Sequence, residues 1–451
     1  MENEWGYIMD FLYLALLFGG VAVIKSLIKP LRKLLLPNSV LAGFLGILFG
    51  PSVLGILNFS YDRLGVIVYH LMAIGFIAIA LKSRKKNSTK TAVNTGFMIA
   101  VSYAIQGILG FGVAIIIALT FFRELFMPFG LLLPLGFAQG PGQAYSLGTQ
   151  WQALGFMNGG TIGLAISTFG FLWAAFGGII LLNALVFRKK TGPFKLEKPK
   201  VRRSVETTVK DYEFSDIDGM TIQMLTVGIV YFVTYMFLKW FANFISDFGT
   251  FGETFSQVLW GFHFVIGVMF AFIFRKFYDR YRIKRKKIEY VNNFLLQRVA
   301  GVVFDFMVAA SIAAISFELI SEYLVPIILL TTIGGFGTML YSIWFCKRIY
   351  KNAVLEHIIA FFGMHTGTIS TGMALLREVD PQFESGTAED MVMGSGLALF
   401  LGLPLMLIIN IPIMGFRLDE PIYYFYTMLA LVAYFAVMYV FWFRKVRVDK
   451  E

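Results

Sequence analysis

Long stretches without a charged side chain recur from one end of the chain to the other. The clearest of them extends from Met391 to Met414. A run of about 18 or more apolar residues is typical of a helix that crosses a bilayer. Bounded by charged or turn-forming residues, such runs predict about eleven spans, at residues 8–28, 38–58, 64–81, 94–119, 159–187, 219–244, 256–274, 291–316, 323–345, 388–414 and 422–443.

Two further stretches, 129–154 and 353–377, are also apolar, but glycine and polar residues interrupt them. Composition supports a membrane protein, because 57% of the 451 residues are hydrophobic and 15% are charged, against about 25% charged in a soluble domain. The N-terminus lacks the basic region of a secretory signal, so we expect the first run to be a true span. The single cysteine, Cys346, excludes an internal disulfide and argues against a multi-cysteine metal site.

Basic residues are concentrated in alternate loops, which predicts the orientation of the spans. Positively charged loops face the cytoplasm as a rule, and here the intervening loops are short and mildly acidic. The N-terminus is therefore expected outside the cell membrane, and the C-terminus and the basic segment 188–218 in the cytoplasm. This topology accounts for the formal net charge of +11, with the lipid bilayer as partner and no nucleic acid expected.

The orientation also constrains the two interrupted stretches. The loop at 121–128 is predicted outside and the loop at 188–211 inside, and the run 159–187 supplies the one crossing needed between them. The stretch 129–154 must then enter and leave on the outer side, as a re-entrant hairpin. By the same reasoning, 353–377 is a hairpin that enters and leaves from the cytoplasm.

The predicted fold class is an all-α polytopic membrane protein with two inverted five-helix repeats, each with a re-entrant hairpin. Each repeat has four spans, a hairpin and a fifth span, and the two begin on opposite sides of the membrane. Inverted repeats with broken segments near the midplane are typical of secondary transporters. The predicted parts are the first repeat (1–187), the cytoplasmic basic linker (188–218), the second repeat (219–414) and an extra C-terminal helix with its tail (415–451).

The hairpins carry the candidate chemistry. Gly140, Pro141 and Gly142 predict a helix break, and a break leaves backbone carbonyls on one side and N–H groups on the other. Carbonyls with hydroxyls suit sodium, and the positive end of a half-helix can receive a carboxylate. Glycines in a membrane protein more often mark close helix packing, but here they cluster with polar side chains. The candidate substrate- and ion-binding residues are Gln139, Gly140, Gly142, Gln143, Ser146 and Thr149 in the first hairpin, and His365, Thr366, Gly367, Thr368, Ser370 and Thr371 in the second.

Charged residues inside predicted spans are costly and are functional candidates by default. Asp305 lies in the middle of 291–316, where a binding role and a structural role are equally favoured. Arg377, just after the second hairpin, is a candidate for holding an anionic substrate. A protonated His365 would couple proton movement to transport. By contrast, we expect Gln106 and Asn410 to bridge helices, and His70, His263 and His357 to serve packing.

At the hairpins the sequence resembles the bacterial sodium/glutamate symporter family, over roughly residues 8–414. The run Ala138-Gln-Gly-Pro-Gly-Gln-Ala144 lies where that family has a Gly-Gly-His-Gly-Thr-Gly-Ala-like run, and 363–376 lies where it has a Gly- and Thr-containing hairpin. The resemblance implies two inverted five-helix repeats, a homodimer and an elevator-type motion. Gln139, Pro141, Gln143 and Asn410 depart from the family pattern, at residues that would select the substrate.

The leading hypothesis is a sodium-coupled symporter that imports glutamate or a related amino acid or carboxylate by alternating access. Sodium would bind at the hairpin tips, with no other cofactor. A proton-coupled carboxylate carrier of the same fold is the alternative, and an ion channel is less favoured because filters usually combine several subunits. We do not expect an enzyme, since paired intramembrane carboxylates, a His-x-x-x-His metal set and a nucleophile elbow are missing from the sequence.

Overall fold

The computed structural model describes residues 2–28, 37–82, 90–188, 218–247, 256, 259–260, 263–285, 290–316, 321–380 and 385–448. All regular secondary structure in these residues is helical. Eight of the described helices are long and apolar enough to cross a membrane, or nine if the bent pair Asp390–Leu401 and Leu403–Leu418 is one span. The chain is therefore a polytopic helical membrane protein. Of the predicted linker 188–218, residues 189–217 lie outside the described residues.

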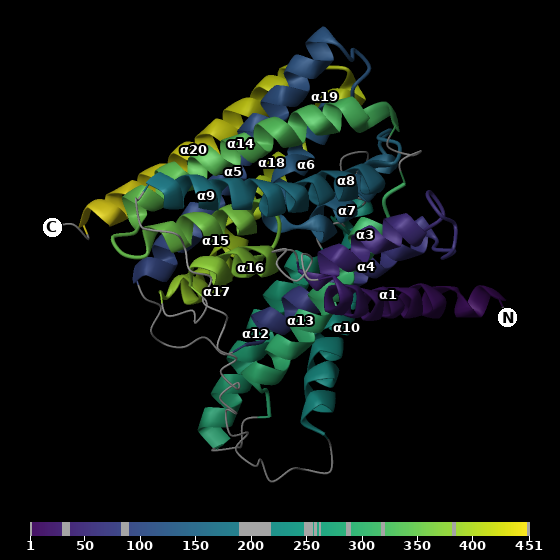
Figure 1. The fold of residues 1–451 in the computed structure, drawn as a ribbon. Coiled ribbons are helices and arrows are strands. Elements are labelled where there is room, and N and C mark those ends of the chain that lie inside the picture. Colours follow the sequence, from purple (N-terminus) through teal and green to yellow (C-terminus); the bar gives the residue numbers. More distant parts are fainter. Residues whose placement is uncertain are drawn as a thin grey trace.

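Six helices form a first helix group, in the lower part of Figure 1. Within it α13 packs against α4 and α3, α12 packs against α4 and α10, and α1 packs against α3. Small residues allow the close approach: a Cβ on Gly43 of α3 would come within 2.5 Å of Ile312 Cβ in α13. The group comprises α1 (Glu2–Leu27), α3 (Asn38–Phe49), α4 (Tyr61–Ala80), α10 (Gly219–Ser246), α12 (His263–Arg285) and α13 (Asn293–Ala313).

The remaining helices form a second helix group, in the upper part of Figure 1. Helix α5 lies at its centre and contacts α14, α17 and α20. The group comprises α5 (Lys90–Thr120), η1 (Met127–Leu131), α6 (Leu132–Pro134), η2 (Leu135–Gln139), α7 (Pro141–Gln152), α8 (Gly159–Leu172), η3 (Trp173–Gly177), α9 (Gly178–Arg188), η5 (Ser321–Tyr323), α14 (Leu324–Ile349), α15 (Val354–Thr366), α16 (Ile369–Val379), α17 (Thr387–Leu401), α18 (Leu403–Ile408), α19 (Ile411–Leu418) and α20 (Ile422–Val448).

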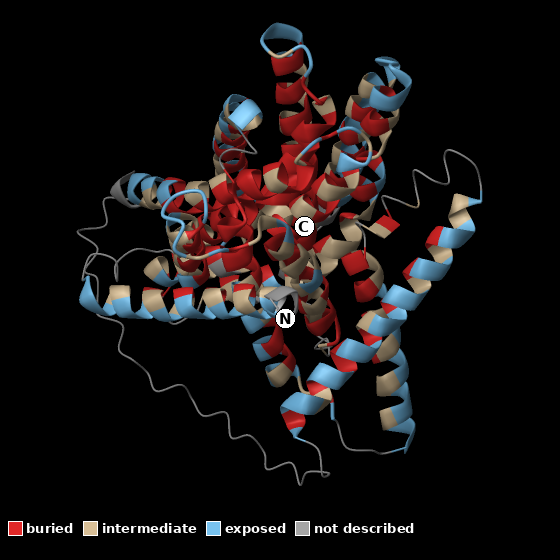
Figure 2. Cartoon of the chain, turned by 90° about the vertical axis from the view of Figure 1, so that its right-hand side faces the viewer, coloured by how far each residue is buried: buried red, intermediate tan, exposed pale blue. Residues whose placement is uncertain are grey.

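The outward faces of the peripheral helices are exposed and apolar. Figure 2 shows a buried centre surrounded by helices whose outer faces are exposed. Large hydrophobic side chains occupy these faces, among them Phe232 in α10, Leu340 in α14 and Phe425 in α20, each more than 60% exposed. A soluble protein rarely exposes so much contiguous apolar surface. Lipid is the solvent that such a surface requires.

Several predicted spans differ in detail from the helices. The span predicted at 38–58 is wrong in length, because α3 ends at Phe49 and Gly50-Pro51 leads into non-helical chain. A helix of 12 residues rises only about 18 Å, short of the roughly 30 Å hydrocarbon core. The span predicted at 256–274 is shifted, since α12 continues to Arg285 and carries its basic residues within the helix. The run 388–414 is bent by 42° after Leu401.

Glycines let the first interrupted segment pack closely on α8. A Cβ on Gly148 of α7 would lie 2.2 Å from the carbonyl oxygen of Gly159, which begins α8. A Cβ on Gly159 would likewise lie 2.2 Å from the Gly148 carbonyl oxygen. Two backbones therefore touch directly, and even a methyl group on either residue would force them apart.

We predict that Gly148→Ala destabilises the protein by about 1–3 kcal/mol, the usual cost of overpacking. Gly228→Ala in α10 is the matched control, because a Cβ added at Gly228 would meet no described atom within 4 Å. The measurement is the temperature at which detergent-solubilised protein loses its monodisperse elution peak. Equal unfolding temperatures for the two variants would contradict the direct contact between α7 and α8.

Candidate functional site

The first interrupted segment contains a sharp break at Gly140. The π-helical turn η2 ends at Gln139, and Gly140 adopts φ 107° and ψ 171°, a conformation that favours glycine. Pro141 then opens α7, where its missing N–H costs no hydrogen bond. Among the described residues, no side chain caps the N-terminus of α7. We call Gly140 the first break.

The second interrupted segment breaks at Gly367 and Thr368, which we call the second break. Helix α15 ends at Thr366, and Thr368 caps α16 in a reciprocal capping box with Thr371. The Thr371 hydroxyl accepts from the Thr368 N–H at 2.7 Å and lies 2.8 Å from the Gly363 carbonyl oxygen of α15. Thr371 therefore ties the two sides of the second break together.

The two breaks meet at one cavity of about 120 Å³. Gln139, Gly140 and Gln143 line it from the first segment, and Gly367 and Thr368 from the second. A Cβ on Gly140 would lie 4.0 Å from Thr368 Cγ2. Segments more than 200 residues apart in the sequence thus converge on a space large enough for a small molecule.

Another part of the cavity lining comes from the first helix group. It consists of aromatic and aliphatic side chains from α4, α12 and α13, while α5, α17 and α18 also contribute. The lining residues from these helices include Phe76, Ile79, Phe264, Val265, Phe304, Met307, Val308, Tyr103, Ser395, Leu399, Leu403 and Met406. The cavity therefore lies between the two helix groups. Gln139, Gln143 and Thr368 at the breaks form its polar wall, Tyr103 and Ser395 add polar groups elsewhere, and the side chains from the first helix group form its apolar wall.

Gln143 is the principal polar side chain at this site. It is only 2% exposed, lines the cavity, and forms no hydrogen bond with another residue in the described part of the chain. Its amide group is therefore available to a ligand in the cavity. The N-termini of α7 and α16 add partial positive charge beside it. This arrangement can hold the oxygens of an anion.

Other predicted site residues lie near the breaks but do not line the cavity. Gly142 packs against Met72 of α4, where an added Cβ would be 2.5 Å from the sulfur. Ser146 is buried further along α7, and Thr149 has a buried hydroxyl without a partner in the described residues. The Thr366 hydroxyl bonds to the Phe362 carbonyl at 2.8 Å within α15. The side chain of Ser370 is not among those described.

His365 is fully buried beside the second break. Its ring lies between Phe361 and Tyr341, with centroid distances of 5.6 and 6.4 Å. Its carbonyl oxygen accepts from Gln106 Nε2 at 2.8 Å, and the same amide donates to Thr338 at 2.9 Å. Gln106 therefore bridges α5, α14 and α15, as predicted.

The two predicted charged residues lie apart from the cavity. Asp305 is exposed on α13, and its carboxylate hydrogen bonds to Ser39 of α3. Arg377 is exposed near the end of α16. Neither is among the cavity-lining residues. Conversely, sequence reasoning missed Tyr103 and Ser395, whose positions inside long apolar runs carry no signal of a shared site.

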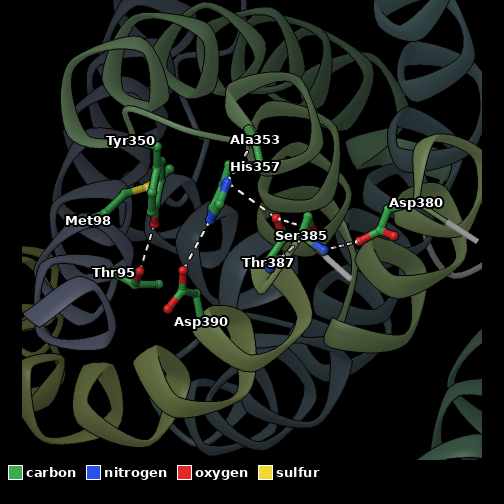
Figure 3. Close-up of polar contacts among 9 residues, drawn as sticks. All are labelled: Thr95, Met98, Tyr350, Ala353, His357, Asp380, Ser385, Thr387 and Asp390. Atoms are coloured by element: carbon green, nitrogen blue, oxygen red, sulfur yellow. Dashed lines mark hydrogen bonds and ion pairs between the residues drawn. The ribbon is translucent and has the colours of Figure 1, made fainter. Parts of the chain in front are cut away.

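A second polar centre lies at the far end of α15 and is shown in Figure 3. His357 Nε2 lies 3.2 Å from Asp390 Oδ2 of α17, and Nδ1 lies 2.7 Å from the Ala353 carbonyl oxygen. The Tyr350 ring stacks on the imidazole at 3.6 Å and its hydroxyl bonds to Thr95 of α5. The sequence predicted a packing role for His357, and the structure adds hydrogen bonds through both ring nitrogens to that role.

Both ring nitrogens of His357 have hydrogen-bonding partners. Nδ1 lies 2.7 Å from the Ala353 carbonyl, which only accepts, and 3.2 Å from the Thr387 hydroxyl, which also donates. Ser385 donates to that hydroxyl at 2.9 Å. A neutral imidazole that donates from Nε2 to Asp390 and accepts from Thr387 at Nδ1 fits this geometry without an additional proton.

Comparisons with known proteins provide no identification. No family model matches the chain, and no curated protein matches it significantly.

We predict that Thr371→Val destabilises the protein by about 1–3 kcal/mol, because it removes bonds on both sides of the second break. Thr226→Val is the control, since the Thr226 hydroxyl bonds within its own helix, to the Ile222 carbonyl at 2.8 Å. Unfolding temperatures in detergent check the prediction. A loss for Thr226→Val as large as that for Thr371→Val would contradict it.

Proposed function

We propose that this protein is a secondary transporter that imports a small organic anion by alternating access, with sodium as the coupling ion. The carrying observation is the convergence of two helix breaks, one from each half of the chain, on a single uncharged cavity. Non-helical backbone at membrane depth is tolerated where it lines a cavity. Substrate sites of secondary transporters are built in this way.

The pattern of helix contacts supports an inverted repeat in which α1, α3, α4, α5 and α8 correspond to α10, α12, α13, α14 and α17. The contact of α1 with α3 matches that of α10 with α12, and α3 with α13 matches α12 with α4. The contact of α5 with α17 likewise matches that of α14 with α8. Exchanging the halves preserves these three contacts, as a pseudo-two-fold axis would. In this proposal 129–154 and 353–377 are the corresponding re-entrant hairpins.

The position of the cavity supports alternating access. It lies between the two helix groups, and direct contacts between the groups include α4 with α7 and α13 with α8. Movement of one group past the other would expose the cavity to opposite sides in turn. The elevator form of this motion and a homodimeric assembly belong to the proposal through the resemblance to the sodium/glutamate symporter family.

Sodium coupling is supported by the chemistry of the breaks. The last carbonyls of η2 and α15 have no following helical N–H to accept from. Those of Gly363 and His365 accept from Thr371 and Gln106 instead, and carbonyl and hydroxyl oxygens are the ligands that hard cations prefer. The negative ends of these half-helices would favour the cation, while the positive ends of α7 and α16 would favour the anion. Sodium and substrate would then bind side by side.

We predict that Gln143→Ala lowers substrate uptake by at least tenfold, because it removes the amide that faces the cavity. The assay is uptake of radiolabelled carboxylates by proteoliposomes under an inward sodium gradient. Gln152→Ala is the control, since Gln152 lies exposed at the end of α7. Equal uptake by the two variants would contradict the site, and ion conductance without saturable uptake would indicate a channel.

The proton-coupled carrier is the second candidate, and the buried contact of His357 with Asp390 favours it. Both residues are buried, and they connect α15 to α17. Binding or release of a proton by this pair would change a contact of the segment that forms the second break. A proton moving with the substrate would therefore alter the site itself.

A proton gradient without sodium distinguishes the two coupling ions. If protons drive transport, wild-type proteoliposomes accumulate substrate under an imposed proton gradient, and Asp390→Asn abolishes this accumulation because the pair has lost its ionisable carboxylate. If sodium drives transport, Asp390→Asn retains uptake under a sodium gradient. Glu420→Gln, an exposed acid before α20, serves as the control in both conditions.

A further inference from the structure

We infer that the substrate is a monocarboxylate with a compact apolar body, such as an arylacetate or a branched-chain fatty acid. This inference rests on the proposed function for the transport step, but the binding it describes is measurable separately. It follows from the division of the cavity into one polar and one apolar wall. No charged side chain is among the described residues that line either wall.

The polar wall suits one carboxylate. The Gln143 amide, the Thr368 hydroxyl and the N-termini of α7 and α16 are gathered at the breaks. The N-terminus of α7 has no side-chain cap among the described residues, whereas Thr368 and Thr371 cap that of α16. The N–H groups of α7, with partial positive charge from α16 and neutral donors, stabilise one negative charge without a counter-ion. The side chain of Gln143 is buried, and its amide has no hydrogen-bond partner among the described residues. An anion here gains a hydrogen bond without displacing one that the protein already makes.

The apolar wall suits the rest of the molecule. Phe264 and Val265 of α12 face the site together with Phe304 and Met307 of α13. These side chains offer contact area to an aromatic or branched aliphatic group, and methionine adapts to its shape. An apolar group that leaves water for this wall gains affinity in proportion to the area buried.

The same wall rejects glutamate and dicarboxylates. A second carboxylate would lie among phenylalanine and methionine side chains, where an unpaired ion is strongly disfavoured. The ammonium group of an amino acid would need an acidic partner, and none of the described acidic residues lines the cavity. A site without these partners discriminates strongly, because each unpaired charge would lose its hydration without compensation.

The experiment measures direct binding to the full-length protein in nanodiscs, followed by uptake in proteoliposomes. Radiolabelled phenylacetate is the probe, competed by unlabelled phenylacetate, phenylacetamide, acetate, succinate and L-glutamate. Phenylacetamide tests whether the ligand must carry a negative charge, and acetate tests whether it needs an apolar body. Succinate and L-glutamate test whether the site accepts a second charged group. Gln143→Ala and the exposed control Gln152→Ala are measured in parallel.

We expect phenylacetate to compete at least tenfold more effectively than each of the other compounds, and Gln143→Ala to weaken it at least tenfold. Stronger competition by succinate or glutamate would overturn the inference while leaving the transporter proposal intact. Binding of phenylacetate without uptake would leave the inference standing and overturn the transporter proposal. Equal competition by phenylacetamide would overturn the assignment of a carboxylate.

Discussion

The structure depends on one constraint: backbone N–H and C=O groups in an apolar solvent must find their hydrogen-bond partners within the protein. In the described residues this constraint is met by helices, which satisfy each group locally. Inside the second helix group it is relaxed at Gly140 and at Gly367-Thr368, and α17 and α18 are bent at Gly402. These interruptions line the same cavity. The breaks in the helices therefore create a place for a ligand.

Holding two breaks in register requires close packing around them. The direct contact of Gly148 with Gly159 anchors α7 on α8, and Gly142 allows α7 to approach Met72 of α4. At the second break, Thr371 bonds to both sides, and Gln106 connects the end of α15 to α5 and α14. Hydrogen bonds of this kind are expensive to lose when buried. Both helix breaks are thus fixed in place by contacts with neighbouring helices.

The two ends of α15 carry different chemistry. One end forms the second break beside the cavity, and the other places His357 against Asp390. Since α15 is a single helix of 13 residues, a change in the contact at His357 would be transmitted to the break about 15–20 Å away. This geometry offers a physical route by which a proton would influence a cavity whose polar wall is made of amide, hydroxyl and backbone groups.

The sequence by itself determined that this is a membrane protein, and it predicted most of the helices. An uncharged run as long as Met391–Met414 lacks the polar face that a helix exposed to water requires. The structure confirms most of the predicted spans: its helices lie close to the predicted ranges for α4, α5, α10, α13, α14 and α20. It also identified the first break, at Gly140-Pro141-Gly142, and the interrupted stretch 353–377 that contains the second, because glycine and proline act on the local backbone. Local signals of this kind do not depend on distant residues.

Only the tertiary structure decided which residues share a site. Gln139, Gly140, Gln143, Gly367 and Thr368 line the cavity, whereas Asp305 and Arg377 lie elsewhere. The apolar wall was not predictable, because Phe264 and Phe304 look like any other residues of a membrane span. The pairing of His357 with Asp390, 33 residues away, was missed for the same reason. Helix packing sets these distances, and a linear pattern of hydrophobicity does not encode which faces meet.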